Sequence, residues 1–300
     1  MNLKVLLILF IAMISVSTSP IIARLLTDIS AVSVSFWRMF IGSSILWIIS
    51  LSPRFIQKPL EKSNRNKTLI SGFLLGLHFF FFFSAVKLTT IANATFLGTT
   101  APLFTIFIEI FWLKRKISKK VIGVLFVILL ASFTIAIDNF NFTSNYTLGN
   151  IYAIICSLLL GIGFIISEDV RQTESTISFS RTLYLSASIT LFVLSLIINK
   201  SLFTPESIFS DSLFNFKNMI GLLALGIIPT IFGHNSLYYA VKHISPSIIS
   251  SVPLGEPIIA SIIAFFLFEE PINILIVMSG LVIISGLIYL INFSVLYKDK

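Results

Sequence analysis

The sequence predicts an all-α membrane protein with ten transmembrane helices, arranged as two inverted repeats of five helices each. Three observations lead to this fold class. First, 56% of the 300 residues are hydrophobic and only 11% are charged, whereas soluble domains keep about a quarter of their residues charged. Second, the mean hydropathy is +0.99, so the surface suits lipid better than water. Third, a sequence pattern in the first half returns in the second half.

Ten apolar segments are each long enough to cross a hydrocarbon core of about 30 Å, which takes about 20 helical residues. A helix satisfies its backbone hydrogen bonds internally, as lipid requires. A transmembrane β-barrel would need polar and apolar residues in alternation, and runs such as VLFVILLASFTIAI do not alternate. The predicted spans are residues 5–23, 30–51, 68–87, 93–113, 120–138, 147–167, 177–199, 219–241, 247–268 and 272–293.

The first apolar segment has a signal peptide as its alternative interpretation, because Lys4 precedes an apolar run. That run continues past Pro20 to Leu26, and no clear cleavage site follows it. We therefore expect an uncleaved first helix.

The loop charges predict how the chain is oriented, since Lys and Arg prefer the cytoplasmic side. With the N-terminus inside, fifteen of the 21 Lys and Arg residues lie inside, four lie outside, and Arg38 and Arg181 lie within spans. The segments 52–67 and 114–120 carry five of the inside residues each. We expect a multi-pass protein of the cell membrane with both termini cytoplasmic. The same bias explains the formal net charge of +8 without a nucleic acid as partner.

The two halves share a pattern at an offset of 155 residues. Ala85-Val86-Lys87 then falls on Ala240-Val241-Lys242, and Pro102 falls on Pro257. Five spans in each half is an odd number, so the second half must be inverted relative to the first. The predicted repeats are residues 1–143 and 144–300, and the charge after the repeated helix changes from basic (Lys114-Arg115-Lys116) to acidic (Glu269-Glu270).

Each half thus has an Ala-x-Lys at a helix end, a mid-helix Pro followed by aliphatic residues, and a last helix with glycines at Gly123, or at Gly280 and Gly286. This pattern resembles the EamA family of the drug/metabolite transporter superfamily. The resemblance implies a secondary, gradient-driven transporter of small metabolites such as amino acids or related compounds, with a leaning towards export. It also implies that the third, fourth, eighth and ninth spans surround the pathway, and that the fifth and tenth lie at the periphery.

Charged groups within the spans are candidates for function, because a charge at a helix centre costs about 2.5–3.5 kcal/mol on insertion. Arg38 occupies a place where the EamA pattern commonly has an Arg. It is interpreted either as a contact for an anion or carboxylate or as a snorkelling residue that ties helices together. Glu256 stands between Gly255 and Pro257, where Pro interrupts the helix, and is either a site residue or a structural carboxylate.

The histidines are candidates for a second role, proton coupling, since their side chain titrates near neutral pH. The candidates for proton coupling are His78, His234 and Glu256. A role in packing is the alternative for both histidines. The candidates for substrate binding are Trp37, Arg38, His78, Thr99, Asn235, Tyr238 and Glu256.

The motifs of enzymes and of nucleotide binding are absent from the sequence. It has no His-x-x-x-His, no Gly-x-Ser-x-Gly and no Gly-rich phosphate loop, and its single Cys156 forms neither an internal disulfide nor a thiolate metal site. We therefore expect no catalytic residue, no metal, no cofactor and no ATP, with the lipid bilayer and a small-molecule substrate as partners. The alternative is a non-transporting membrane protein, either a lipid-modifying enzyme or an assembly subunit. The sequence leaves open the substrate, the coupling ion and whether the chain forms a homodimer.

Overall fold

The computed structural model describes residues 3–55, 58–137, 143, 146–199, 208–268, 272 and 274–298. Within these ranges every regular element is a helix and there is no strand. Ten helical segments are long and apolar enough to cross a membrane, which confirms the predicted all-α membrane fold and its ten spans. Glu269 and Glu270 lie outside the described residues.

Six α-helices and two short elements make up the first five spans and the loops between them. They are α1 (Leu3–Leu25), α2 (Ala31–Leu51), the 3-10 turn η1 (Pro53–Phe55), α3 (Lys62–Leu88), α4 (Ile91–Gly98), α5 (Ala101–Phe107), the π-helix η2 (Ile108–Trp112) and α6 (Lys119–Ala136). Hydroxyl side chains cap the start of α2, α4 and α6 by accepting a hydrogen bond from a free backbone N–H. The fourth span is broken at Thr99 and Thr100, and Pro102 stands in the first turn of α5.

The second five spans contain more irregular helix. They are α7 (Thr147–Arg171), α8 (Thr176–Asn199), the 3-10 turn η5 (Asp211–Phe214), α9 (Phe216–Leu225), the π-helix η6 (Gly226–His234), α10 (Asn235–Ala240), α11 (Pro246–Ile249), the 3-10 turn η7 (Val252–Gly255), α12 (Glu256–Phe268) and α13 (Ile274–Lys298). The eighth span comprises α9, η6 and α10, and the ninth comprises α11, η7 and α12. The helix break that the sequence predicts at Gly255-Glu256-Pro257 is confirmed, because η7 ends and α12 begins there.

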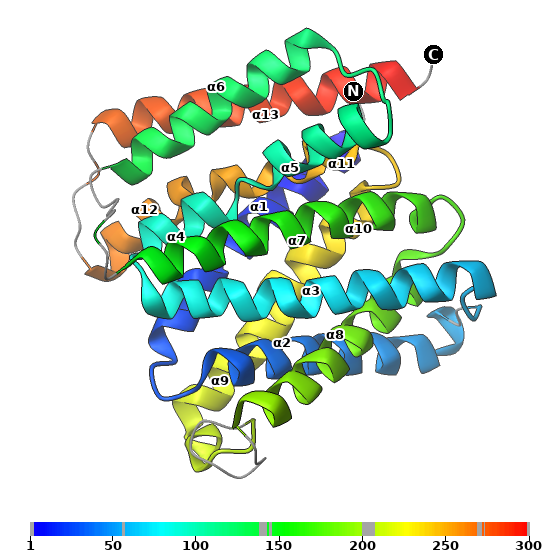
Figure 1. Cartoon of the computed structure of the whole chain (residues 1–300), viewed down its shortest axis with the longest axis vertical. Coiled ribbons are helices and arrows are strands. Elements are labelled where there is room, and N and C mark those ends of the chain that lie inside the picture. Colours follow the sequence, from blue (N-terminus) through cyan, green and yellow to red (C-terminus); the bar gives the residue numbers. More distant parts are fainter. Residues whose placement is uncertain are drawn as a thin grey trace.

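Helices of the two halves pack against one another through the middle of the molecule. In Figure 1, α3 lies along α7 and α8, α2 lies along α8, and α1 lies along the span formed by α9, η6 and α10. By contrast, α6 and α13 pair with each other at one edge of the molecule (Figure 1). The fifth and tenth spans are thus peripheral, and the remaining spans surround the interior.

Gly72 and Gly76 bring α3 close to α8. A Cβ atom at Gly72 would come within 2.5 Å of the Leu183 carbonyl oxygen, and one at Gly76 within 2.9 Å of the Ala187 carbonyl oxygen. Backbones that approach this closely gain van der Waals contact, which is a main source of helix association in lipid. The Gly72-x-x-x-Gly76 pattern thus marks the face of α3 that packs closely on α8.

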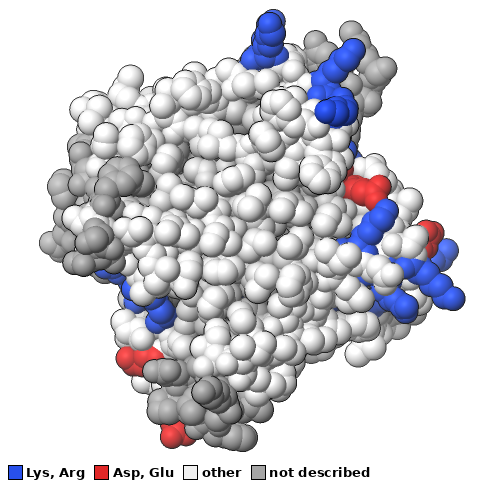
Figure 2. Space-filling model, in the orientation of Figure 1, with Lys and Arg blue, Asp and Glu red and all other residues white. Residues whose placement is uncertain are grey.

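The charged side chains lie at the margins of the face that Figure 2 shows, and its middle has none. Figure 2 shows a broad face without Lys, Arg, Asp or Glu, and basic residues along its margins. One such group lies at the edge where Figure 1 places the start of α3 and the end of α7, and there Lys67 forms a 2.5 Å salt bridge with Asp169. A wide apolar face with charged margins is what a chain surrounded by lipid requires.

Candidate functional site

Arg38 lies at the centre of a buried polar cluster. It is 1% exposed, and α2 presents it to α1 and η6. Its Nε donates to Thr230 Oγ1 at 2.9 Å and its Nη1 donates to Ser19 Oγ at 2.6 Å. Its Nη2 has no hydrogen-bond partner among the described residues. The guanidinium therefore connects three spans and still has donors to spare.

Aromatic rings of α3 lie against the Arg38 guanidinium. Its Cζ is 4.0 Å from the centroid of the Phe79 ring and 5.7 Å from that of Phe83. The negative face of an aromatic ring attracts a cation, and the attraction grows when water is excluded. The five consecutive phenylalanines of α3 thus include two that support a buried charge.

Two histidines from opposite halves meet beside this guanidinium. His78 of α3 and His234 of η6 have ring centroids 6.3 Å apart, and both rings pack edge-on against Phe79. His78 Nδ1 is 2.8 Å from the Cys156 carbonyl oxygen of α7, so that nitrogen carries the proton in the neutral ring. His234 Nδ1 has no partner in the described part of the chain. A ring nitrogen is therefore left without a hydrogen-bond partner inside the cluster.

Two tyrosines enclose the cluster on the side of α8 and α10. Tyr184 and Tyr238 have ring centroids 6.4 Å apart and are 0% and 1% exposed. The Tyr184 hydroxyl donates to the Thr230 carbonyl oxygen at 3.4 Å, while Tyr238 packs edge-on against Phe179. Rings with a polar tip suit a site that holds a molecule with both apolar and polar parts.

Glu256 supplies the acidic group of the cluster. It is the first residue of α12 and is 6% exposed, and a helix N-terminus favours a carboxylate. The charge of Arg38 acts on it, yet no salt bridge joins these two described residues, and Glu256 Oε2 has no hydrogen-bond partner among them. The acidic and the basic group of the cluster are thus both buried without forming a salt bridge with each other.

The other candidates from the sequence lie in different surroundings. Trp37 is next to Arg38 in sequence but faces away from it, since its Nε1 donates to the Ile208 carbonyl oxygen at 2.8 Å. Thr99 is buried at the break of the fourth span, and its hydroxyl donates to the Phe96 carbonyl oxygen at 3.1 Å. Asn235 follows His234 and is half-buried, with an Oδ1 that lacks a partner in the residues described. The structure therefore brings together Arg38, His78, His234, Tyr238 and Glu256 and keeps Trp37 apart from them.

Sequence reasoning missed several members of the cluster. Ser19, Tyr184 and Thr230 contact Arg38 or each other, but none of them carries a charge that would mark it within an apolar span. One signal was available. Pro229 stands directly before Thr230 inside an apolar segment, and a proline there leaves a backbone carbonyl that needs a new donor.

A separate charge network lies near the start of α6. Arg115 Nη1 donates to Glu109 at 2.9 Å and to Glu168 at 2.6 Å, so it joins η2 to the end of α7. Burial acts to lower the pKa of Arg115, but the hydrogen bonds and charges of Glu168 and then Glu109 outweigh it and raise that pKa. Lys114 adopts a left-handed φ of 53°, which turns the chain back so that Arg115 reaches Glu109. The basic segment thus has a structural role besides its topological one.

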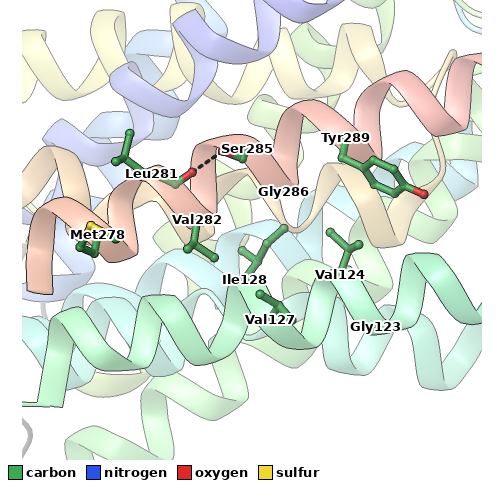
Figure 3. Close-up of a pocket in the computed structure, with 10 residues that line it drawn as sticks. All are labelled: Gly123, Val124, Val127, Ile128, Met278, Leu281, Val282, Ser285, Gly286 and Tyr289. Atoms are coloured by element: carbon green, nitrogen blue, oxygen red, sulfur yellow. Dashed lines mark hydrogen bonds between the residues drawn. The ribbon is translucent and has the colours of Figure 1, made fainter.

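Two hollows lie away from the cluster. An open groove of about 560 Å³ runs between α6 and α13 and is lined mostly by aliphatic side chains and glycines (Figure 3). A second hollow of about 410 Å³ lies between the end of α1 and the end of α3, where Arg24 and Lys87 border it. Neither hollow contains a residue of the buried cluster. The described residues also include no group of three His, Cys, Asp or Glu side chains that could hold a metal ion.

Comparisons with known proteins agree on one family and one fold. The model of the EamA-like transporter family matches residues 3–137 and again residues 147–292. An uncharacterized transporter from Archaeoglobus fulgidus is 22% identical over 292 residues, covering 95% of this chain and 96% of that protein. A solved crystal structure superposes with a TM-score of 0.74 at 16% identity and covers 96% of both chains, which supports the fold alone.

Proposed function

This chain belongs to the EamA-like transporter family and is a membrane transporter, and from this premise we propose that it is a gradient-driven secondary carrier of small metabolites. The substrates we propose are amino acids or related compounds that cross the cytoplasmic membrane, with export as the direction. The named relative is a transporter, and these comparisons point to a transporter rather than an enzyme. A lipid-modifying enzyme or an assembly subunit is correspondingly less well supported.

The observation that carries the proposal is the buried cluster around Arg38. A scaffold in lipid has no reason to bury a guanidinium, two imidazoles and a carboxylate, because each costs free energy there. Here these groups come from both halves of the chain and are 1–6% exposed. Substrate sites of secondary transporters built from two repeats lie between the repeats near the midplane. The two separate matches to the family model support the reading of residues 1–143 and 144–300 as such repeats.

The proposed binding mode is a clamp for a zwitterion. Arg38 has an unpaired Nη2 that can donate to a carboxylate, and Glu256 has an unpaired Oε2 that can accept from an ammonium group. A ligand that carries both charges would neutralise both buried groups at once. Around these two, the proposed lining comprises Trp37, His78, Thr99, Asn235 and Tyr238. Trp37 contributes through its neighbour Arg38, because its own ring faces Ile208.

Proton coupling is proposed through the same cluster. His78, His234 and Glu256 are the titratable candidates, and the free Nδ1 of His234 can take up a proton without breaking an existing hydrogen bond. Protonation there would place a second positive charge beside Arg38 and so alter the affinity for substrate. A carrier of this kind needs no nucleotide.

The test is a metabolite screen in proteoliposomes, with and without a proton gradient. We expect flux of at least one small zwitterion, with Arg38→Ala and Glu256→Gln each lowering it at least tenfold, since each removes a hydrogen bond to a charged group. Arg181→Ala is the matched control, because Arg181 is also a buried arginine but lies over Trp47, away from the cluster. Full activity in both variants would exclude the clamp and leave the carrier standing. No flux of any metabolite by folded protein would contradict the carrier itself.

A further inference from the structure

Thr230, which accepts a hydrogen bond from Arg38, lies in an irregular part of its helix. In an α-helix the N–H of residue 229 would donate to the carbonyl oxygen of Leu225. Pro229 has no N–H, and η6 is a π-helix at this point. The Thr230 hydroxyl donates to the Leu225 carbonyl oxygen instead, at 2.8 Å. The proline thereby fixes which way the proton of this hydroxyl points.

The direction of this hydroxyl proton decides which kind of hydrogen bond Thr230 can form with Arg38. A hydroxyl has one proton and two acceptor lone pairs, and the proton is committed to Leu225. Thr230 Oγ1 therefore acts as an acceptor towards Arg38 Nε, at 2.9 Å. Ser19 Oγ accepts from Nη1 at 2.6 Å. Two neutral oxygens thus hold two of the three nitrogens, and neither of them neutralises the charge.

The packing of α2 on η6 keeps this contact in register. Gly42 lies one turn after Arg38, and a Cβ atom there would come within 2.6 Å of Thr230 Cγ2. A Cβ atom at Gly226 would likewise come within 2.4 Å of Ile41 Cγ2. Such tight contacts on both sides leave little freedom for one helix to slide along the other. Arg38 is also in contact with Phe79, with its Cζ 4.0 Å from the ring centroid.

We propose that Thr230 is a positioning residue that holds Arg38 so that Nη2 binds the carboxylate of a monoanionic or zwitterionic substrate. Arg38 cannot bind a carboxylate through Nε and Nη2 together, since Nε already donates to Thr230. Among the described members of the cluster, Arg38 is the one lysine or arginine and Glu256 opposes it in charge. A zwitterion, or a carboxylate taken up together with a proton, leaves this pair neutral overall, whereas a phosphate dianion would leave an excess negative charge in a buried site. This inference rests on the proposed carrier function and adds to it the residue that positions the carboxylate contact.

The experiment measures ligand binding by the purified full chain in detergent, from the shift of its thermal unfolding midpoint. The probes are the twenty standard L-amino acids, acetate and lactate, followed by the amide of each carboxylate that stabilises the protein. We expect the acid to bind at least tenfold more tightly than its amide. Thr230→Val keeps the shape but removes the acceptor and should weaken acid binding about tenfold, the usual size for a hydrogen bond to a charged group. Thr230→Ser keeps the hydroxyl and should restore binding.

The matched control is Thr134→Val, which removes a hydroxyl that donates to the Leu130 carbonyl oxygen on the peripheral helix α6. Ser19→Ala removes the acceptor of Nη1 without altering η6, and it keeps the test available if Thr230→Val does not fold. Unchanged acid binding in folded Thr230→Val and Ser19→Ala would overturn the positioning role. Equal binding of acid and amide, or no stabilisation by any carboxylate probe, would overturn the substrate class. The flux screen decides the carrier function separately from either result.

Discussion

Arg38 shows how a buried arginine is made tolerable without an acidic partner. Two hydroxyl oxygens and an aromatic face surround the guanidinium, and these replace part of the water it has lost. None of them removes its charge. The guanidinium therefore keeps a positive charge in a buried place, which is what the proposed contact with a carboxylate requires.

Arg115 is the opposite case, because it is paired with two carboxylates. Its partner Glu109 has a side chain that is 2% exposed, whereas Arg115 itself is 41% exposed. Breaking a fully buried pair by removing one partner costs about 3–5 kcal/mol. The loss should be smaller here, since water reaches the arginine.

We predict that Arg115→Met lowers the free energy of unfolding by about 1–3 kcal/mol, the cost of leaving a buried acceptor without its donor. The measurement is the midpoint of thermal unfolding in detergent. Lys116→Met is the control, because it removes an adjacent exposed cation. Adding Glu109→Gln to Arg115→Met should recover part of the loss, since the buried group is then neutral. Equal midpoints for Arg115→Met and Lys116→Met would show that the network does not stabilise the fold.

At the scale of elements, the helix irregularities gather where the polar groups lie. The π-helix η6 presents Thr230 and His234, and the 3-10 turn η7 leads directly into Glu256. The fourth span is broken as well, at Thr99. Regular helices such as α6 and α13 lie at the edge instead. Irregular backbone in a membrane protein is tolerated where protein surrounds it, which agrees with this distribution.

The contact of α3 with α8 gives a prediction about packing. Gly72→Ala should lower the free energy of unfolding by about 1–3 kcal/mol, as overpacking usually does, because the new methyl group would meet the Leu183 carbonyl oxygen. Gly123→Ala on α6 is the matched control, since nothing lies within 4 Å of its added Cβ and alanine favours the helix by about 1 kcal/mol. The thermal midpoints of both variants, measured side by side, check this. A Gly72→Ala variant as stable as Gly123→Ala would mean that α3 and α8 separate without cost.

At the scale of the whole molecule, orientation in the membrane is the property to test. We predict that both termini are cytoplasmic, from the excess of Lys and Arg in the loops assigned to that side. In a Cys156→Ala background, Lys116→Cys should react with an impermeant thiol reagent only after the membrane is opened. Asp211→Cys, exposed in η5, should react in intact cells. Labelling of Asp211→Cys from the inside alone would contradict the inverted arrangement of the two halves.

The sequence by itself determined that lipid surrounds this protein, how many spans it has and which of its residues are unfavourable to bury in a membrane. Those features are local, because a stretch of about 20 apolar residues is a transmembrane helix whatever its neighbours are. A charge within such a stretch is recognisable without a structure, so Arg38, His78, His234 and Glu256 could be predicted as candidates. The helix break before Glu256 was equally readable, since Gly and Pro act on the adjacent backbone.

Only the tertiary structure decided which side of each helix faces the interior. In lipid both the inner and the outer face of a helix are apolar, so no amphipathic stripe tells them apart. Trp37 and Arg38 are adjacent in sequence, yet one faces Ile208 and the other faces Thr230. The partners of Arg38 come from α1 and η6, up to 192 residues away in the chain, and uncharged Ser and Thr give no local sign of such a role. The site is set by how ten nearly uniform apolar helices pack, and that depends on contacts between distant segments that no single stretch of sequence contains.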